Sequence, residues 1–197
     1  GGHLLLDDGE FIYTYDDRGA LIARQHQISG ETLNIDYDSL NRATGVTLSD
    51  GAGTVISQAS YGFTPTGTRT FAEVDGQERH FIYDGENVIA ALDSSGQVVW
   101  RRFHARSIDR PFAVDDGSQV NWLLSDHNGS IRDVVSTSGS TIAHFAYDAF
   151  GRQVIGPDPD LDDSIRFTGR EFDVPGGLAY YRARLYDPNI GRFISED

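Results

Sequence analysis

The sequence contains no cysteine, no lysine and no methionine among its 197 residues. Without cysteine the chain can form no disulfide framework, no thiol nucleophile and no thiolate zinc site, although this does not fix its compartment. No apolar run approaches the ~18 residues that a membrane helix needs, and no signal peptide is visible. Stability must therefore come from packing and from the pairing of backbone hydrogen bonds.

Acidic residues outnumber basic ones by 30 to 16, which gives a formal net charge of -14. Such a charge argues against a nucleic-acid interface, which needs a basic patch, and against electrostatic binding to anionic lipid. When glycine is counted with the apolar residues, the composition is that of an ordinary globular protein and argues against intrinsic disorder. The negative charge therefore argues against nucleic acid and anionic lipid as partners, but it does not argue against a folded core.

A degenerate repeat of about 20 to 24 residues covers nearly the whole chain, and such repeats decide the fold. Its mark is a tyrosine followed by an aspartate, with Tyr61-Gly62 in the same phase. The pairs are Tyr15-Asp16, Tyr37-Asp38, Tyr83-Asp84, Tyr147-Asp148 and Tyr186-Asp187.

Each repeat has the same local pattern. Bulky residues alternate before the tyrosine, as in Leu33, Ile35 and Tyr37, and this period of two is typical of a strand with one buried face. A residue that tolerates positive φ follows four positions after the tyrosine. These residues are Gly19, Asn41, Asn87 and Gly151. The repeat therefore predicts strand, turn, strand.

A second set of turns falls between the repeats, marked by dipeptides such as Asp75-Gly76 and Ser138-Gly139. No stretch keeps the apolar spacing of a helix over three turns. We therefore predict an all-β fold. Neighbouring hairpins must pair to bury their apolar faces, as a coiled sheet, a solenoid or a propeller would allow. Two strands per repeat favour a long antiparallel sheet of consecutive hairpins over propeller blades.

Four motifs in the C-terminal half resemble the associated core of RHS (rearrangement hot spot) proteins. They are DHNGSIR at 126–132, YDAFGR at 147–152, FTGREFD at 167–173 and YYRARLYDPNIGRF at 180–193. The upstream Tyr-Asp pairs look like RHS/YD repeats. The departures are small: Asn128 stands where the family often has leucine, and Leu185 where it often has tyrosine.

The resemblance implies that the sheet spirals into part of a hollow shell that encloses a covalently linked C-terminal toxin. The resemblance also implies a bacterial protein that is secreted or lies at the cell surface. Its implied partners are secretion proteins or toxin-complex delivery proteins. Two alternatives stay open: a YD-repeat protein for cell-surface adhesion or carbohydrate binding, and a self-cleaving aspartyl protease. The resemblance implies no cofactor and no metal. An open sheet edge could also pair with a second copy.

We expect YD-repeat hairpins over residues 1–120 and the RHS repeat-associated core over residues 121–197, in one continuous sheet. The chain begins Gly1-Gly2 without an initiator methionine, which we interpret as an internal piece of a longer protein. We interpret the core as truncated at its C-terminus.

Asp197 matches the first of two aspartates that the resemblance assigns to self-cleavage. Two carboxylates are needed because one activates water while the other protonates the carbonyl oxygen. We therefore expect no enzyme activity from this piece. Asp187 is the substitute candidate, although a role in the turn at Asp187-Pro188-Asn189 is favoured. Arg184 could orient the acids or pair with a local carboxylate.

Two further features of the sequence could bind a ligand: a group of aspartates and two tryptophans. Asp158, Asp160, Asp162 and Asp163 alternate as calcium ligands do, but a helix-loop-helix site would need glycine and glutamate where Asp163 and Gly169 stand. A looser calcium site or a solvated acidic loop remains. Trp100 and Trp122 are candidate ligand platforms, although large aromatics on a sheet more often pack.

Overall fold

The computed structural model describes residues 4–156 and 165–195, and within them the chain is all-β with two short 3-10 turns. The predicted fold class is confirmed. Thirteen strands follow one another: β1 (Phe11–Tyr15), β2 (Leu21–His26), β3 (Thr32–Tyr37), β4 (Ala43–Ser49), β5 (Val55–Phe63), β6 (Arg69–Val74), β7 (Gln77–Asp84), β8 (Asn87–Leu92), β9 (Val98–His104), β10 (Pro111–Asp115), β11 (Val120–Ser125), β12 (Ile131–Ser136) and β13 (Thr141–His144).

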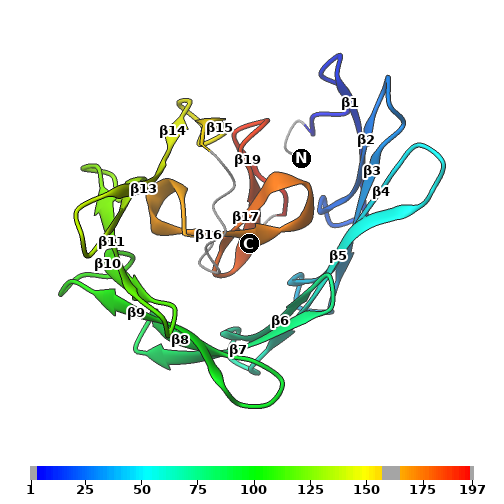
Figure 1. Ribbon diagram of the computed structural model, residues 1–197. Helices are drawn as coiled ribbons and strands as arrows, with labels where there is room; N and C mark the ends of the chain where they lie inside the picture. The colour runs from blue at the N-terminus through cyan, green and yellow to red at the C-terminus, as the bar shows by residue number, and fades with distance from the viewer. Residues whose placement is uncertain (1–3, 157–164, 196–197) are drawn as a thin grey trace. The chain divides into compact units, whose positions relative to one another are not determined.

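These strands are hydrogen-bonded in chain order, from β1 to β13, so each hairpin follows the last (Figure 1). The register alternates as a half-buried sheet requires. Leu33 and Ile35 are buried, whereas Asn34 and Asp36, which alternate with them, are exposed. The antiparallel sheet of consecutive hairpins is therefore confirmed.

The chain divides into two compact units, which we describe separately. The first comprises residues 1–77, 173–187 and 192–197, and the second comprises residues 78–172 and 188–191. Tyr13, Leu21, Leu33 and Val46 are among the core residues of the first unit. The expected division at residue 120 follows the sequence motifs and stays a prediction.

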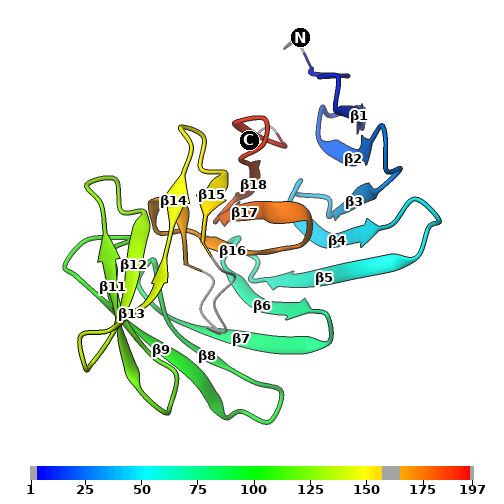
Figure 2. The same ribbon diagram turned by 45° about the horizontal axis from the view of Figure 1, so that its top comes forward.

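The remaining strands form two further sheets. β14 (Ala146–Tyr147) pairs with β15 (Gln153–Ile155), and a four-stranded sheet contains β16 (Glu171–Val174), β17 (Leu178–Tyr181), β18 (Arg184–Asp187) and β19 (Arg192–Phe193). The expected single continuous sheet is therefore wrong. Left-handed backbone reverses the chain on both sides of β16, in η1 (Phe167–Gly169) and η2 (Pro175–Gly177). In the first unit, η2 lies against β4 and β5 (Figure 2).

The repeated tyrosine ties its strand to the start of an earlier strand. The Tyr37 hydroxyl donates to the Leu21 carbonyl at 3.0 Å, and the Tyr147 hydroxyl donates to the Ile131 carbonyl at 2.9 Å. Both spans are 16 residues long. Burial raises the pKa of Tyr37 and keeps its phenol protonated as a donor. The tyrosine is thus required for its hydroxyl as well as for its ring.

We expect Tyr37→Phe to lower the free energy of unfolding by about 1–3 kcal/mol, because it leaves the Leu21 carbonyl without this donor. Urea unfolding of the two proteins measures the difference. Tyr147→Phe removes the equivalent hydrogen bond to the Ile131 carbonyl and should show a loss of similar size. A loss below about 0.5 kcal/mol in Tyr37→Phe would show that water replaces the hydroxyl.

The repeated aspartate builds the turn that follows. The Asp38 carboxylate accepts hydrogen bonds from the backbone N–H groups of Leu40 and Arg42 and forms an ion pair with the Arg42 guanidinium. Asn41 between them adopts a φ of 61°. Asp148 repeats this arrangement with Phe150, Arg152 and left-handed Gly151. The motif Asp-x-x-Gly/Asn-Arg is therefore one self-contained turn.

One predicted turn differs. Asn87 was expected to supply the positive φ after Tyr83, but Gly85 does so, with a φ of 57°. The hairpin from β7 to β8 is closed by only two residues, Gly85 and Glu86, so the reversal comes earlier. The Asn87 side chain is released for another task and accepts a hydrogen bond from the Asp109 backbone N–H.

Acid should weaken these turns. Burial alone would raise the pKa of Asp38, but hydrogen bonds from the Arg42 side chain and from the Arg42 and Leu40 backbone together lower it. The unfolded chain therefore takes up the proton first. The stabilisation is complete above the unfolded pKa, near 3.8, and is lost as the pH falls through the folded value.

We expect thermal stability to fall as the pH is lowered below about 4, and Asp38→Asn to make that fall shallower. Asparagine keeps the turn geometry but does not titrate. Melting curves from pH 6 to pH 2 measure the slope. An identical slope in both proteins would contradict a contribution from Asp38.

Candidate functional site

Three arginines of the hairpin strands have buried side chains. Arg24 lies on β2, Arg69 on β6 and Arg102 on β9, and their side chains are 5%, 1% and 2% exposed. A buried charge is costly unless it is paired and hydrogen-bonded. Each of the three meets a carboxylate from the C-terminal core motifs.

In the first unit, Arg24 holds the end of β18. Its guanidinium forms an ion pair and hydrogen bond with Asp187, whose side chain is fully buried. A second guanidinium nitrogen donates to the Gly176 carbonyl in η2 at 3.1 Å. Arg24 also lies over the Phe11 ring, 4.8 Å from its centroid. One side chain from β2 therefore fixes two points of the segment 173–187.

Arg69 holds the same segment at β16. Its two terminal nitrogens donate to the two Asp173 oxygens at 3.2 and 2.9 Å. This two-pronged geometry is the strongest form of an arginine–carboxylate contact. The guanidinium carbon lies 3.9 Å from the centroid of Tyr180 in β17. Arg69 thus contacts two adjacent strands of the C-terminal sheet.

In the second unit, Arg102 donates to Glu171 at 2.9 Å and lies 3.9 Å from the Trp100 ring centroid. Thr168, in the same FTGREFD motif as Glu171, donates its backbone N–H to the Ser130 hydroxyl at 3.0 Å. We call the three pairs Arg24–Asp187, Arg69–Asp173 and Arg102–Glu171 the arginine anchors. Within each unit they attach the core motifs to a hairpin strand.

The arginine anchors can position a chain but offer no nucleophile or free acid. Asp187 belongs to the anchor with Arg24. This contact was not part of the turn role that we favoured for Asp187 from the sequence. The Arg184 guanidinium lies 4.0 Å from the Phe193 ring centroid. Asp197 and the acids at 158, 160, 162 and 163 lie outside the described residues. The catalytic roles of Asp197, Asp187 and Arg184 stay predictions.

The candidate residues predicted from the sequence did not include Arg24, Arg69 or Arg102. One signal was available, since Arg102 is two residues from Trp100 and therefore shares its face of the strand. Trp100 is buried in the structure, whereas Trp122 is 44% exposed. The buried Trp100 could therefore have predicted from the sequence that Arg102 faces the same buried side of β9.

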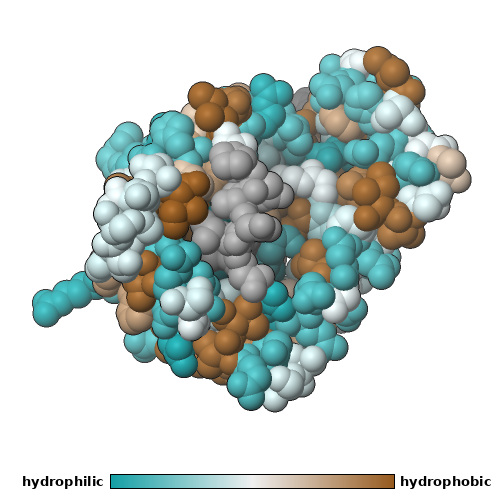
Figure 3. Space-filling view, in the orientation of Figure 1, coloured by the Kyte–Doolittle hydropathy of each residue, from teal (hydrophilic) through white to brown (hydrophobic). Residues whose placement is uncertain are grey.

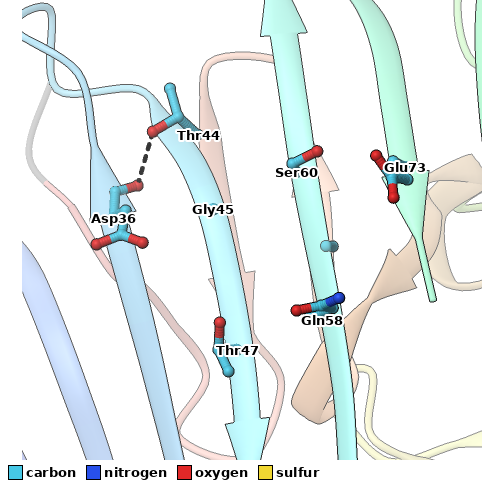
Figure 4. Close-up of a pocket in the computed structure, with 8 residues that line it drawn as sticks. Asp36, Thr44, Gly45, Thr47, Gln58, Ser60 and Glu73 are labelled. Atoms are coloured by element: carbon cyan, nitrogen blue, oxygen red, sulfur yellow. Dashed lines mark hydrogen bonds between the residues drawn. The ribbon is translucent and has the colours of Figure 1, made fainter. Parts of the chain in front are cut away.

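A polar pocket of about 410 Å³ lies on β3 to β6 (Figure 4). Asp36, Gly45, Ser60 and Glu73 are successive cross-strand neighbours along it. Three strand spacings of ~4.8 Å place Asp36 and Glu73 roughly 14 Å apart. Two carboxylates at that separation cannot share a proton as an aspartyl-protease pair does.

Other site types find no support in the described part. Between residues 4 and 195, leaving out 157–164, no group of three or more His, Asp or Glu side chains could hold a metal ion. Over the same ranges, no helix has the length and apolarity to cross a membrane. Hydrophobic and hydrophilic residues are mixed on the face seen in Figure 3.

Comparisons with known proteins agree with this architecture. Salivary gland surface protein 1 of Aedes aegypti is 29% identical over 95% of this chain and 6% of its own length. The tRNA3(Ser)-specific nuclease WapA of Bacillus spizizenii is 26% identical over 97% of this chain and 10% of its own length. The chain thus spans a tenth or less of these relatives.

A crystal structure of TcdB2-TccC3-TEV matches 95% of this chain and 12% of that one, with a TM-score of 0.60 at 18% identity, which shows the same fold. The family model described as Teneurin YD-shell matches residues 73–197. Because that match covers well over half of the sequence, the chain belongs to the teneurin YD-shell family, and the resemblance to RHS/YD-repeat proteins is confirmed.

Proposed function

We propose that this chain is part of the wall of a secreted RHS/YD shell that encapsulates a C-terminal toxin polypeptide for delivery. The observation that carries the proposal is the set of arginine anchors. A wall that holds a cargo needs its last segment fixed, so that the chain leads into the cargo from a defined place. In each unit the core motifs are fixed to a hairpin strand by a buried ion pair.

The relatives support a toxin role. WapA is named as a nuclease. Because this chain spans only a tenth of that protein, it is consistent with a structural part of such a toxin rather than with the nuclease part. The wide separation of Asp36 and Glu73 in the polar pocket also gives no support to an aspartyl-protease reading of that pocket. The partners in this proposal are the covalently linked cargo and secretion or toxin-complex delivery proteins, outside the cell that makes them.

Protease protection of the full-length gene product tests the proposal. We expect any sequence that follows Asp197 to resist a non-specific protease as long as the YD region is folded, and to be digested quickly when expressed alone. Equal digestion rates in the two settings would overturn encapsulation. An exposed tail on a cell surface would instead support the adhesion alternative, with which the name of the Aedes relative agrees.

Self-cleavage is tested separately by the intact mass of the full-length protein and of its Asp197→Asn variant. If self-cleavage occurs and uses Asp197, only the variant stays as one chain. If both are cut, or both stay whole, Asp197 is not a cleaving residue. This result leaves the protection experiment unaffected, so the two proposals fail independently.

A further inference from the structure

The polar pocket on β3 to β6 holds two carboxylates that have no partner in the part of the chain that the structure describes. Asp36 on β3 and Glu73 on β6 stand at its two ends (Figure 4). Neither carboxylate forms an ion pair or a hydrogen bond with a described residue. The described residues that line the pocket include no lysine, arginine or histidine. In contrast, the carboxylates of Asp38 and Asp115 each form an ion pair with an arginine. The pocket therefore lacks a cation that a ligand could supply.

A glycine in the middle of β4 leaves room between the two acids. Gly45 is the cross-strand neighbour of Asp36 on one side and of Ser60 on the other, with no register shift at this position. Glycine inside a strand weakens it, and it often marks a bulge or a place where a ligand approaches the backbone closely. The regular register excludes the bulge. A Cβ on Gly45 would lie 3.1 Å from the Asp36 Oδ2 atom, so the Asp36 carboxylate leans over the glycine.

Neutral polar side chains line the pocket between the acids. Thr47 lies on β4, and Gln58 and Ser60 lie on β5. These three side chains make no hydrogen bond to another described residue. Their hydroxyl and amide oxygens can accept hydrogen bonds from N–H donors. A ligand that fits the pocket should therefore carry N–H groups along its length as well as a positive charge at each end.

The separation of the acids decides the kind of cation. Their backbones lie roughly 14 Å apart across three strand spacings, whereas a metal ion binds carboxylate oxygens at about 2.0–2.6 Å. One metal ion therefore cannot contact both acids. An ammonium–carboxylate contact takes up about 2.8 Å at each end, which leaves roughly 8–14 Å between two ammonium groups. The pocket volume of about 410 Å³ is large enough for a small organic molecule of that length.

We propose that this pocket binds a linear polyamine, with one terminal ammonium group at Asp36 and the other at Glu73. An inner amine of the ligand donates to the neutral side chains between them. The net charge of -14 raises the local concentration of such cations. Because Asp36 alternates with the buried Ile35, the pocket opens on the face opposite to the core. The site therefore shares no residue with the arginine anchors and does not depend on encapsulation.

Calorimetry of the whole chain at low ionic strength tests the proposal with spermidine, 1,8-diaminooctane, putrescine and Mg²⁺. We expect spermidine to bind with a dissociation constant of about 1 mM or below. The two diamines carry the same charge, but only the longer one can reach both carboxylates. 1,8-Diaminooctane should therefore bind at least about threefold more tightly than putrescine or Mg²⁺, and spermidine more tightly still because of its inner amine.

Three variants separate the pocket from the general negative charge. Asp36→Asn combined with Glu73→Gln should weaken spermidine binding about tenfold or more. The matched control, Asp17→Asn combined with Glu31→Gln, removes the same charge from two acids outside the pocket and should change the affinity less than about twofold. Gly45→Thr keeps both pocket acids but fills the space between them, and should weaken binding about fivefold or more.

Circular dichroism and thermal unfolding confirm that the variants are folded. The proposal is overturned if spermidine does not bind at millimolar concentration, or if the control variant loses as much affinity as the pocket variant. It is also overturned if putrescine or Mg²⁺ binds as tightly as 1,8-diaminooctane, because the two acids would then not be bridged. None of these outcomes affects the protection experiment.

Discussion

Replacing Arg24 by methionine is expected to lower the free energy of unfolding by about 3–5 kcal/mol. The Asp187 side chain is fully buried and its ion-pair partner is Arg24. Methionine fills much of the same space but removes the Arg24 charge and hydrogen bond from a fully buried carboxylate. The hydrogen bond to the Gly176 carbonyl is lost as well. Urea or thermal unfolding monitored by circular dichroism measures the loss.

Two comparisons make this prediction specific. Arg101→Met breaks an ion pair whose arginine is 52% exposed, and should cost less than about 1 kcal/mol. The double variant Arg24→Met with Asp187→Leu removes both charges, and should recover much of the loss, because apolar pairs often replace buried ion pairs without cost. If the double variant is less stable than Arg24→Met alone, the buried charge of Asp187 is not the cause of the loss.

Gly169→Ala should strongly destabilise the second unit. Gly169 has a φ of +71°, and an added Cβ would lie 2.5 Å from the Asp109 carbonyl oxygen. The left-handed conformation costs about 1–2 kcal/mol for alanine, and the overlap with backbone adds about 1–3 kcal/mol. We therefore expect a total loss of about 2–5 kcal/mol, measured by the same unfolding experiments.

Gly139→Ala separates the two causes. Gly139 has a φ of +86° with no atom within 4 Å of the added Cβ. Its alanine variant should therefore lower the free energy of unfolding only by the conformational cost of about 1–2 kcal/mol. Equal losses in the two variants would show that the close approach to Asp109 does not matter. The glycine of the FTGREFD motif would then be required for its φ alone.

The fold could be predicted because its determinants are local. The alternation before Tyr37 and the turn built by Asp38 both act within one hairpin. The sequence of each repeat therefore specifies its own two strands and the turn between them. Asn87 shows the limit of this reasoning. Its position matched the pattern, but a two-residue loop moved the positive φ to Gly85.

The arginine anchors could not be predicted because they join residues far apart in sequence. Arg24 and Asp187 are separated by 163 positions, and an arginine in an alternating strand resembles a solvent-exposed residue. The same distance explains the error about a single sheet. Nothing local in the YYRARLYD segment says that its strands pair with one another rather than extend the hairpins.

Buried arginines fix the C-terminal strands to the hairpin strands. Hydrogen exchange of Arg69→Met measured by mass spectrometry tests it most directly, because Arg69 contacts Asp173 in β16 and Tyr180 in β17. We expect the backbone amides of β17 and β18 to exchange faster in the variant, while those of β10 to β12 keep their protection. Unchanged protection in β17 and β18 would contradict it.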